Sequence, residues 1–588
     1  MIRFNEKEIT GRLTDYNNNN ANQAFSAGSL EYDLFEDVSK KYMNRYYKET
    51  FPEFYEAKQK GIIYNHDAAQ ELFKGINCFC HDPRFILRKG VRAYGDNDIG
   101  VSAGPAKHLS TALEHLAQTM GLATSYMAGG QAVAMFNYAL APYAEGLSDK
   151  ELYQAIQQFM FQMNESYKNR GSQSMFSSID ILLECPEWLE NKLAVGPGGV
   201  YLDRTYGSYK ETAKKIAHTI TEVSFNGDYD KKPLFFPNLI YNIDGADLSE
   251  WEDVFDLSAK FALPYFSVPS NNGVEYATVM GCRTTLPQNW TGDPETDCMG
   301  TGNAVYTTIC LPILALYAEQ EGKDFFEELD KYMDIVREYN LRRLEWIEKL
   351  WYEYHTADFL IQELDGKPMY RLEDATIVCG YLGLSECCEI LYGKPLHECN
   401  EQARSIMLHM RHRVDEYKIQ DGLRWGLFQT PAENCTHTLA KIAVKDFGFK
   451  KSYARGTATA PYYTNSNHVR VDADISIIER VKIEGNNQPI GSAGNIMNIY
   501  TSEAYSNPVA LSKLVGRIRD LTKAYFYAIT GEFSICTNCR TTYNGNVEVC
   551  SLCGGECDTF SRITGYVTNV RRTWNKGKLS EFSERKRY

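Results

Sequence analysis

Four cysteines near the end of the chain have the spacing of a metal site. Cys536, Cys539, Cys550 and Cys553 form a C-x2-C-x10-C-x2-C array. Two pairs of thiolates on short turns can close a tetrahedral site, which is the geometry that zinc prefers. Because cysteine fills all four positions, no ligand position remains for water, and the array predicts a structural zinc. The alternative is four buried or reactive thiols without a metal.

A glycine follows this array at short range. The sequence R-I-T-G-Y places Gly565 twelve positions after Cys553. A structural metal supplies folding free energy that a short terminal segment cannot obtain from a core of its own. We therefore predict that the four-cysteine module holds the loop around Gly565 in a fixed position.

Three further residues could carry chemistry. Cys282 follows the predicted strand Tyr276–Met280 and a glycine, as expected for the tip of an active-site loop. Cys78 ends the short segment I-N-C, and Glu433 follows a proline turn in T-P-A-E-N. A buried Glu433 would be a candidate general acid or base. The alternatives are inert thiols and an exposed glutamate.

Composition limits the class of protein. The 588 residues are 44% apolar and 23% charged, as in soluble globular proteins. No apolar run reaches the roughly 18–20 residues of a membrane span, and the first residues lack a signal-peptide pattern. The net charge of −14 argues against a nucleic-acid partner. Sixteen scattered cysteines without a leader favour a reducing, cytoplasmic location.

Helical patterns alternate with short apolar strands through the middle of the chain, which predicts an α/β fold. Phe235–Ile243 and Tyr276–Met280 are predicted strands. The clearest helical pattern covers Lys323–Tyr354, and its apolar stripe predicts core packing rather than a cofactor site.

The chain from about residue 62 to its end resembles the anaerobic (class III) ribonucleotide reductases, which are glycyl radical enzymes. The resemblance rests on many short motifs in the family's order and spacing, together with the zinc array and R-I-T-G-Y. These motifs are His66-Asp67 followed by Asn77-Cys78, G-G-Q from Gly129, R-G-S-Q-S-M-F from Arg170, M-G-C-R-T around Cys282, G-T-G-N ending at Asn303, T-P-A-E-N around Glu433, Y-T-N-S-N-H-V from Tyr463 and N-K-G-K from Asn575.

The resemblance implies a ten-stranded α/β barrel with a small zinc-ribbon and glycyl-radical module at the C-terminus. It divides the chain into an N-terminal helical leader (1–60), a catalytic barrel (61–530) and the zinc and radical module (531–588). Only about sixty residues precede the barrel motifs, and they lack the signature of the ATP-binding regulatory domain that many members carry. We therefore expect no on–off control through such a domain.

The resemblance also implies a role for each candidate residue. A radical on Gly565 takes the hydrogen of Cys282, and the resulting thiyl removes the 3′-hydrogen of a ribonucleoside triphosphate. Cys78 then gives a hydrogen on the opposite face of the sugar. Glu433 moves protons at the hydroxyl groups, and Asn303 forms hydrogen bonds to the substrate or the reductant.

Several partners follow from the resemblance. The chain lacks a C-x3-C-x2-C cluster motif, so a separate radical-S-adenosylmethionine activase would install the radical. An allosteric (deoxy)nucleoside triphosphate and a homodimer are also implied.

The reductant stays open at this stage. Formate-dependent members carry a histidine and a tyrosine where this chain has Tyr64 and Phe428, whereas Glu433 and Asn303 keep the formate-type pattern. Cys310 lies near the sequence position at which members that use thioredoxin carry an additional redox cysteine. A Cys78–Cys310 disulfide reduced by a thioredoxin-like redoxin is therefore the alternative to formate, and a core thiol is the other interpretation of Cys310.

Two other functional classes share parts of the pattern. Another glycyl radical enzyme, acting on a small carbon substrate, would share the R-x-x-G-Y motif around Gly565. A zinc ribbon can also bind nucleic acid, here through the basic residues of the tail between Arg571 and Arg587. The acidic charge of the whole chain disfavours this last interpretation.

Overall fold

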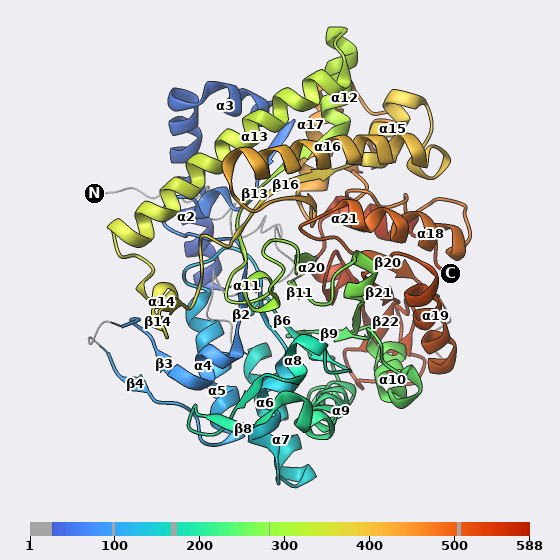
Figure 1. The fold of residues 1–588 in the computed structure, drawn as a ribbon. Helices are drawn as coiled ribbons and strands as arrows, with labels where there is room; N and C mark the ends of the chain where they lie inside the picture. The colour runs from blue at the N-terminus through green and yellow to red at the C-terminus, as the bar shows by residue number, and fades with distance from the viewer. Residues whose placement is uncertain (1–25, 97–99, 166–172, 282, 503–506) are drawn as a thin grey trace, which may run out of the picture.

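The computed structural model describes residues 26–96, 100–165, 173–281, 283–502 and 507–588, and Figure 1 shows how they are arranged. Helices and strands alternate along most of the chain. The longest strands belong to two sheets of seven and four strands, with helices packed around them. The predicted α/β class is confirmed, while closure into a single ten-stranded barrel stays a prediction.

The seven-stranded sheet is parallel except at one pair. Its spatial order is β2 (Phe79–His81), β5 (Gln131–Val133), β6 (Ser177–Leu182), β9 (Asn238–Asn242), β10 (Tyr265–Ser267), β21 (Phe526–Thr530) and β20 (Met497–Tyr500). The antiparallel pair is β10 with β21. Every residue of β6 and β9 is buried, as expected for parallel strands covered on both faces.

The second sheet contains three parallel strands and one antiparallel edge strand. Its order is β1 (Ile63–Asn65), β13 (Asn303–Cys310), β16 (Thr376–Leu382) and β17 (Trp425–Gln429). Two single β-bridges connect the sheets, one between Cys80 and Thr301 and one between Phe428 and Gly494.

Two groups of helices surround the sheets (Figure 1). The first group consists of α5 (Leu109–Ala123), α6 (Phe136–Ala144), α7 (Asp149–Glu165), α9 (Lys210–Asn226), α10 (Glu252–Phe261) and α19 (Pro508–Leu521). The second consists of α12 (Leu311–Glu321), α13 (Phe325–Glu348), α15 (Leu384–Tyr392), α16 (Asn400–Asp421) and α17 (Cys435–Phe447). The predicted helix at Lys323–Tyr354 corresponds to α13, and its apolar stripe is buried in the core, which confirms the packing interpretation.

Two helices precede the first strand. They are α2 (Ala27–Thr50) and α3 (Pro52–Gln59). Their buried residues join the core around α13, where the ring of Phe54 stacks on that of Tyr339 with centroids 4.1 Å apart. The predicted boundary of a separate leader at residue 60 stays a prediction.

A β-hairpin lies close to several strands of the seven-stranded sheet. Its strands are β11 (Ala277–Met280) and β12 (Thr284–Pro287), which pair antiparallel. β11 contacts β2, β5 and β6, and Figure 1 shows it near the middle of the molecule. The predicted strand at Tyr276–Met280 is therefore confirmed.

The C-terminal residues form a small antiparallel sheet. Its order is β23 (Thr542–Asn544), β22 (Phe533–Cys536), β24 (Cys557–Arg562) and β25 (Val567–Asn569). Gly565 lies in the turn between β24 and β25. The chain ends in α20 (Val570–Thr573) and α21 (Lys576–Glu584). A buried ion cluster lies within α21, where Glu581 accepts from Lys578 at 2.5 Å and from Arg585 at 2.9 Å. Arg585 also donates to the Arg562 carbonyl at 3.1 Å, which attaches the end of the helix to β24.

Candidate active site and candidate metal centre

One cavity of about 260 Å³ brings together most of the predicted catalytic segments. Cys78 and Glu433 line it directly, and so do Gly281, which precedes Cys282, and Thr564 and Tyr566, which flank Gly565. These segments are far apart in sequence, so the tertiary fold alone brings them to one space. Cys282 itself lies outside the described residues, as do Arg170, Gly171 and Ser172 of the predicted R-G-S-Q-S-M-F motif.

The thiol of Cys78 is held by close backbone packing. Its backbone N–H donates to the carbonyl oxygen of Asn303 at 3.0 Å, and its S–H donates to Asn77 Oδ1 at 2.9 Å. A Cβ on Gly129 would lie 2.6 Å from the Cys78 sulfur, and a side chain on Gly302 would overlap the Cys78 carbonyl. The G-G-Q and G-T-G-N motifs therefore contain glycine because the chain passes directly against Cys78 at both places.

Replacing Gly129 with alanine is expected to displace the thiol that it contacts. We expect at least roughly tenfold loss of turnover, because misplacement of a reacting group by about 1 Å can cost up to 100-fold in rate. The matched control is Gly121→Ala on α5, where the new Cβ would have one neighbour, Met175 Sδ at 3.7 Å. Alanine there should stabilise the helix by about 0.5–1 kcal/mol. Thermal melting and nucleotide reduction measure both effects, and normal turnover in Gly129→Ala would contradict the packing argument.

The residues next to Cys282 in sequence are fixed. The Gly281 N–H donates to Ser178 Oγ at 3.2 Å, and Ser178 in turn donates to the Gln131 carbonyl at 3.1 Å. On the other side, Arg283 is fully buried and donates from Nη1 to the Thr430 carbonyl at 3.2 Å. The M-G-C-R-T turn is thus attached to both sheets.

Asn303 lies behind the cavity wall rather than on it. Its Nδ2 is 3.5 Å from Oγ1 of Thr284, which lines the cavity. Its Oδ1 is buried and accepts no hydrogen bond from the described residues. The structure therefore brings Asn303 near the other predicted residues, one side chain removed from the cavity.

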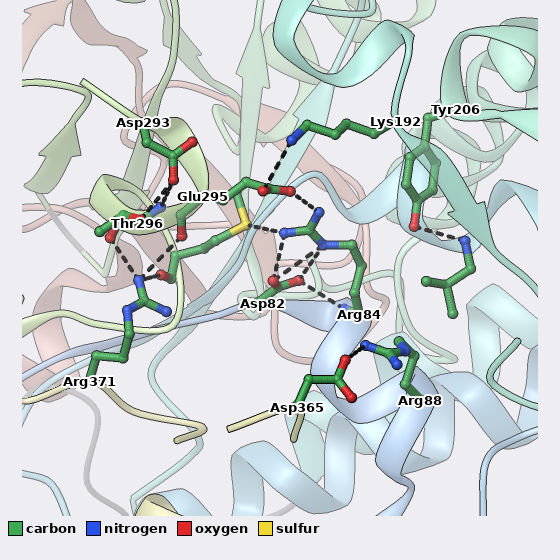
Figure 2. Close-up of polar contacts among 12 residues, drawn as sticks. Asp82, Arg84, Arg88, Lys192, Tyr206, Asp293, Glu295, Thr296, Asp365 and Arg371 are labelled. Carbon is green, nitrogen blue, oxygen red and sulfur yellow. Dashed lines mark hydrogen bonds and ion pairs between the residues drawn. The ribbon is translucent and has the colours of Figure 1, made fainter. Parts of the chain in front are cut away.

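A polar network fixes the segment that leads to Asn303 (Figure 2). Arg371 donates from Nη2 to three carbonyl oxygens, those of Glu295 at 3.2 Å, Thr296 at 2.7 Å and Met299 at 2.8 Å. Arg84 binds the carboxylates of Asp82 and Glu295. Burial favours a raised pKa for Glu295, but the charges of Arg84 and Lys192 outweigh it and hold the pKa below its usual value. This carboxylate therefore stays ionised as a structural anchor.

Glu433 contacts the residue after Gly565. It lies in the loop between β17 and α17, and its Oε2 accepts a hydrogen bond from the Tyr566 hydroxyl at 2.6 Å. Asn575 of the N-K-G-K motif donates to Asn434 Oδ1 at 2.7 Å and to the Glu433 carbonyl at 3.3 Å. The C-terminal module therefore attaches to the T-P-A-E-N loop at two places. Sequence reasoning missed Tyr566, since nothing local links a tyrosine to an acid 133 positions away.

The two positions that depart from the formate-type pattern form part of one wall. Tyr64 and Phe428 line the cavity together with His66, Tyr306 and Cys435. The His66 ring stacks on Tyr306 with centroids 4.0 Å apart. Loss of solvation lowers the pKa of His66 to about 3, so the imidazole is neutral at physiological pH. Burial raises the pKa of Cys435 to about 12, which keeps that thiol protonated.

Cys310 cannot pair with Cys78 in this fold. Cys78 bonds to Asn303 at the start of β13, whereas Cys310 is the last residue of that eight-residue strand. Seven residue steps along a strand span about 23 Å. A disulfide requires Cα atoms within about 7 Å. The Cys78–Cys310 alternative is therefore wrong for this conformation, because strand direction places the two thiols at opposite ends of β13.

The four predicted zinc ligands converge on one point. Their sulfur atoms all lie within 4.8 Å of one another, with 3.5 Å between Cys536 and Cys553 and 3.5 Å between Cys539 and Cys550. Tetrahedral zinc with Zn–S bonds of about 2.3 Å places its sulfurs about 3.8 Å apart. The N–H groups of Asn538 and Cys539 both donate to the Cys536 sulfur at 3.4 Å, which favours the thiolate. The donor set fits a structural zinc.

A fifth cysteine offers a matched control for this centre. Cys557 is buried directly opposite Cys536 in the β22–β24 register, but it is not one of the four converging residues. We expect Cys536→Ser to lose its zinc and to lower the melting temperature, whereas Cys557→Ser should keep one zinc per chain. Elemental analysis by mass spectrometry measures the metal. Full zinc content in Cys536→Ser would contradict the assignment.

Among the helices that the structure describes, none is long and apolar enough to cross a membrane.

Comparison with known proteins agrees with this geometry. A family model described as "Anaerobic ribonucleoside-triphosphate reductase" matches residues 19–588. The curated protein of that name from Escherichia coli K12 is 24% identical over 634 residues, which cover 99% of this chain and 85% of the relative. The one from Enterobacteria phage T4 is 23% identical over 641 residues and covers 99% of both chains.

Solved structures share the fold. One described as "Anaerobic ribonucleotide reductase" superposes with a TM-score of 0.77 at 18% identity, covering 94% of this chain and 88% of the other. The Thermotoga maritima enzyme in complex with dATP and CTP gives a TM-score of 0.73 at 18% identity, covering 95% and 92%.

The chain thus has a mixed α/β fold that is shared with solved ribonucleotide reductase structures. More narrowly, the family match over nearly all of its length shows that the chain belongs to the anaerobic (class III) ribonucleoside-triphosphate reductases.

Proposed function

We propose that the cavity between Cys78 and the turn after β11 is where this reductase binds the ribose of its substrate. As a member of its family, the chain converts ribonucleoside triphosphates to 2′-deoxyribonucleoside triphosphates. The observation that carries the site is the convergence of Cys78, Gly281, Glu433 and Tyr566 on one space. Its volume of about 260 Å³ lies below the roughly 300–1,000 Å³ of pockets that enclose a whole drug-sized ligand, which suits a sugar.

In the proposed mechanism the chain supplies two thiols, one acid and one radical. The Gly565 radical takes the hydrogen atom of Cys282, and the thiyl takes the ribose 3′-hydrogen. Glu433 manages the protons as the 2′-hydroxyl leaves as water, and Cys78 gives a hydrogen atom to the sugar. The reductant restores the Cys78 thiol and adds one electron and one proton to the 3′-ketone that remains, and the resulting 3′-radical takes its hydrogen back from Cys282, which regenerates the thiyl. Each turnover consumes two electrons and two protons from a reductant.

Contacts around Glu433 support its role as the acid. Its bond to the Tyr566 hydroxyl holds the carboxylate beside the radical loop while leaving it on the cavity wall. A carboxyl group within hydrogen-bond reach of the substrate hydroxyls is what proton transfer needs. Asn303 would orient the substrate or the reductant through its buried amide.

We propose that the strands close into the ten-stranded barrel that the sequence predicts. The seven-stranded sheet together with β13, β16 and β17 amounts to ten strands. The bridge Cys80–Thr301 brings the segment before β13 beside β2, and the bridge Phe428–Gly494 brings the segment before β20 beside β17, which supports closure. The antiparallel pair β10–β21 fits a barrel made of two parallel halves. The domain limits of 1–60, 61–530 and 531–588 are part of the same proposal.

The partners are also proposed. Zinc on the four cysteines would hold the Gly565 loop, and a radical-S-adenosylmethionine activase would install the radical. The Thermotoga maritima structures with CTP and with dATP in a specificity site suggest a substrate and an effector of the same chemistry for this chain. We also propose a homodimer.

Two reductants are compatible with the cavity. Formate suits the Glu433 and Asn303 pattern. A redoxin would need a second thiol near Cys78, and Cys435 is the other cysteine that lines the cavity among the described residues. Release of labelled CO₂ from formate in step with dCTP formation would establish formate, whereas redoxin-driven turnover that Cys435→Ser abolishes would establish the thiol route.

The test of the function is an anaerobic assay. The chain is incubated with the activase, S-adenosylmethionine and a reductant, and CTP reduction is followed beside electron paramagnetic resonance. A doublet signal from one α-hydrogen together with dCTP formation supports the proposal. A radical-bearing chain that consumes small carbon acids and leaves nucleotides unchanged would refute it.

A further inference from the structure

One buried amide touches both loops of the proposed radical path. Asn238, the first residue of β9, donates from Nδ2 to the Gly281 carbonyl at 3.2 Å and to the Gly565 carbonyl at 3.3 Å. The two carbonyl oxygens therefore lie close together, because both are within hydrogen-bond distance of the same nitrogen atom. The side chain is only 4% exposed, so water cannot readily replace it.

A second side chain donates to the same carbonyl of Gly565. The hydroxyl of Tyr265, the first residue of β10, bonds to this oxygen, and the residue is fully buried. The guanidinium of Arg562 lies 4.0 Å from the centroid of the Tyr265 ring. A cation over an aromatic face withdraws electron density from the ring, which makes the phenol a stronger hydrogen-bond donor.

We propose that Asn238 and Tyr265 are positioning residues for the radical glycine. Asn238 sets the separation between the Gly565 loop and the turn that contains Gly281. Tyr265 stabilises the radical through the hydrogen bond from its hydroxyl group to the Gly565 carbonyl oxygen. This inference rests on the proposed function, because it takes Gly565 as the site of the radical.

The physical basis is the electronic structure of a glycyl radical. The unpaired electron on the α-carbon is shared with the adjoining carbonyl oxygen, which then carries more negative charge. Two donors on that oxygen therefore favour the delocalised radical over a localised one. Neither residue makes or breaks a covalent bond. Asn238 differs from Tyr265 because it also holds Gly281, and hydrogen-atom transfer depends steeply on the distance between donor and acceptor.

Three variants separate these roles. In Asn238→Ala both bonds are lost, and in Asn238→Asp the shape is kept while a donor becomes an acceptor that faces two carbonyl oxygens. Tyr265→Phe removes only the hydroxyl group. The measurements are radical content per chain, radical lifetime without substrate, and dCTP formed per radical. If Asn238 only fills space, Asn238→Asp should be the better tolerated of the two Asn238 variants, because it keeps the shape of the side chain. If Asn238 acts as a hydrogen-bond donor, Asn238→Asp should lower the dCTP formed per radical.

We expect both Asn238 variants to form roughly 10- to 100-fold less dCTP per radical. Tyr265→Phe should instead shorten the radical lifetime and leave dCTP per radical unchanged. The matched control is Asn271→Ala, since Asn271 also joins two carbonyl oxygens, those of Arg519 at 2.9 Å and Ala524 at 3.0 Å, away from the cavity. Its radical content and turnover per radical should equal those of the wild type.

Wild-type product per radical in Asn238→Asp, together with an unchanged radical lifetime in Tyr265→Phe, would overturn the inference. If Asn238→Ala fails to fold, which thermal melting would show, the other two variants still decide it. A wild type that holds a radical but reduces no CTP would refute the proposed function instead. The lifetime measurement would then still test the contact between Tyr265 and Gly565.

Discussion

Replacing Gly565 with alanine is expected to abolish both the radical signal and nucleotide reduction. Glycine has no Cβ, so its α-radical can become planar and share its electron with both neighbouring amides without steric conflict. A methyl group would clash with those amides in the planar state. It would also occupy part of the space through which the hydrogen atom passes, because Gly565 is buried against side chains of the seven-stranded sheet.

The fold itself should survive this substitution. The hairpin from β24 to β25 is held by the Ile563 N–H donating to the Tyr566 carbonyl at 3.1 Å and by Asn498 donating to the Thr564 carbonyl at 3.2 Å. Neither bond involves residue 565. We expect a melting temperature within a few degrees of the wild type and a normal zinc content. Gly516→Ala on α19, where a Cβ would have one neighbour at 3.6 Å, is the control with full activity. A doublet or measurable turnover in Gly565→Ala would disprove the radical assignment.

Replacing Cys78 with alanine is expected to stop deoxyribonucleotide formation while leaving the glycyl radical intact. Cys78 lies on the cavity wall, next to Asn303 and opposite the turn at Gly281. It is not on the proposed path from Gly565 to Cys282. The activase should therefore generate a normal amount of radical, whereas the sugar would lack its hydrogen donor. We expect turnover to fall by at least roughly 1,000-fold, a loss typical of removing one essential reacting group.

The control for Cys78 is a second buried cysteine close by. Cys80 lies two residues farther along, is fully buried and does not line the cavity. Cys80→Ala should keep turnover and lose only stability through the small space that it leaves. Electron paramagnetic resonance and product analysis on the same samples distinguish the two variants. Equal turnover of Cys78→Ala and the wild type would remove Cys78 from the mechanism, and loss of the radical in Cys78→Ala would place Cys78 on the activation path.

Local sequence patterns predicted part of the fold and part of the site. The stripe within Lys323–Tyr354 identified α13, because helical periodicity is a property of neighbouring residues. The zinc array was readable for the same reason, since two C-x2-C turns and their spacing are local features. The Cys282, Cys78 and Glu433 roles came from the resemblance to the reductase family, not from their immediate surroundings.

The Cys310 alternative failed for a reason that the sequence does not contain. Proximity between Cys78 and Cys310 depends on which end of β13 faces Cys78, and strand direction in a sheet is set by the topology of the whole chain. The apolar residues that end at Cys310 predict a strand, but their pattern does not show which end of that strand lies near Cys78.

The sequence by itself determined the protein family through the resemblance of its motifs. It also determined the α/β class and the four-cysteine module, because these depend on periodicity and short-range spacing. Only the tertiary structure decided how the reactive segments meet. The contacts of Gly565 with Asn238 and Tyr265 join residues 327 and 300 positions apart, and the bond between Tyr566 and Glu433 spans 133 positions. No local pattern specifies such pairs, since they result from the packing of the C-terminal module against the two sheets and their loops.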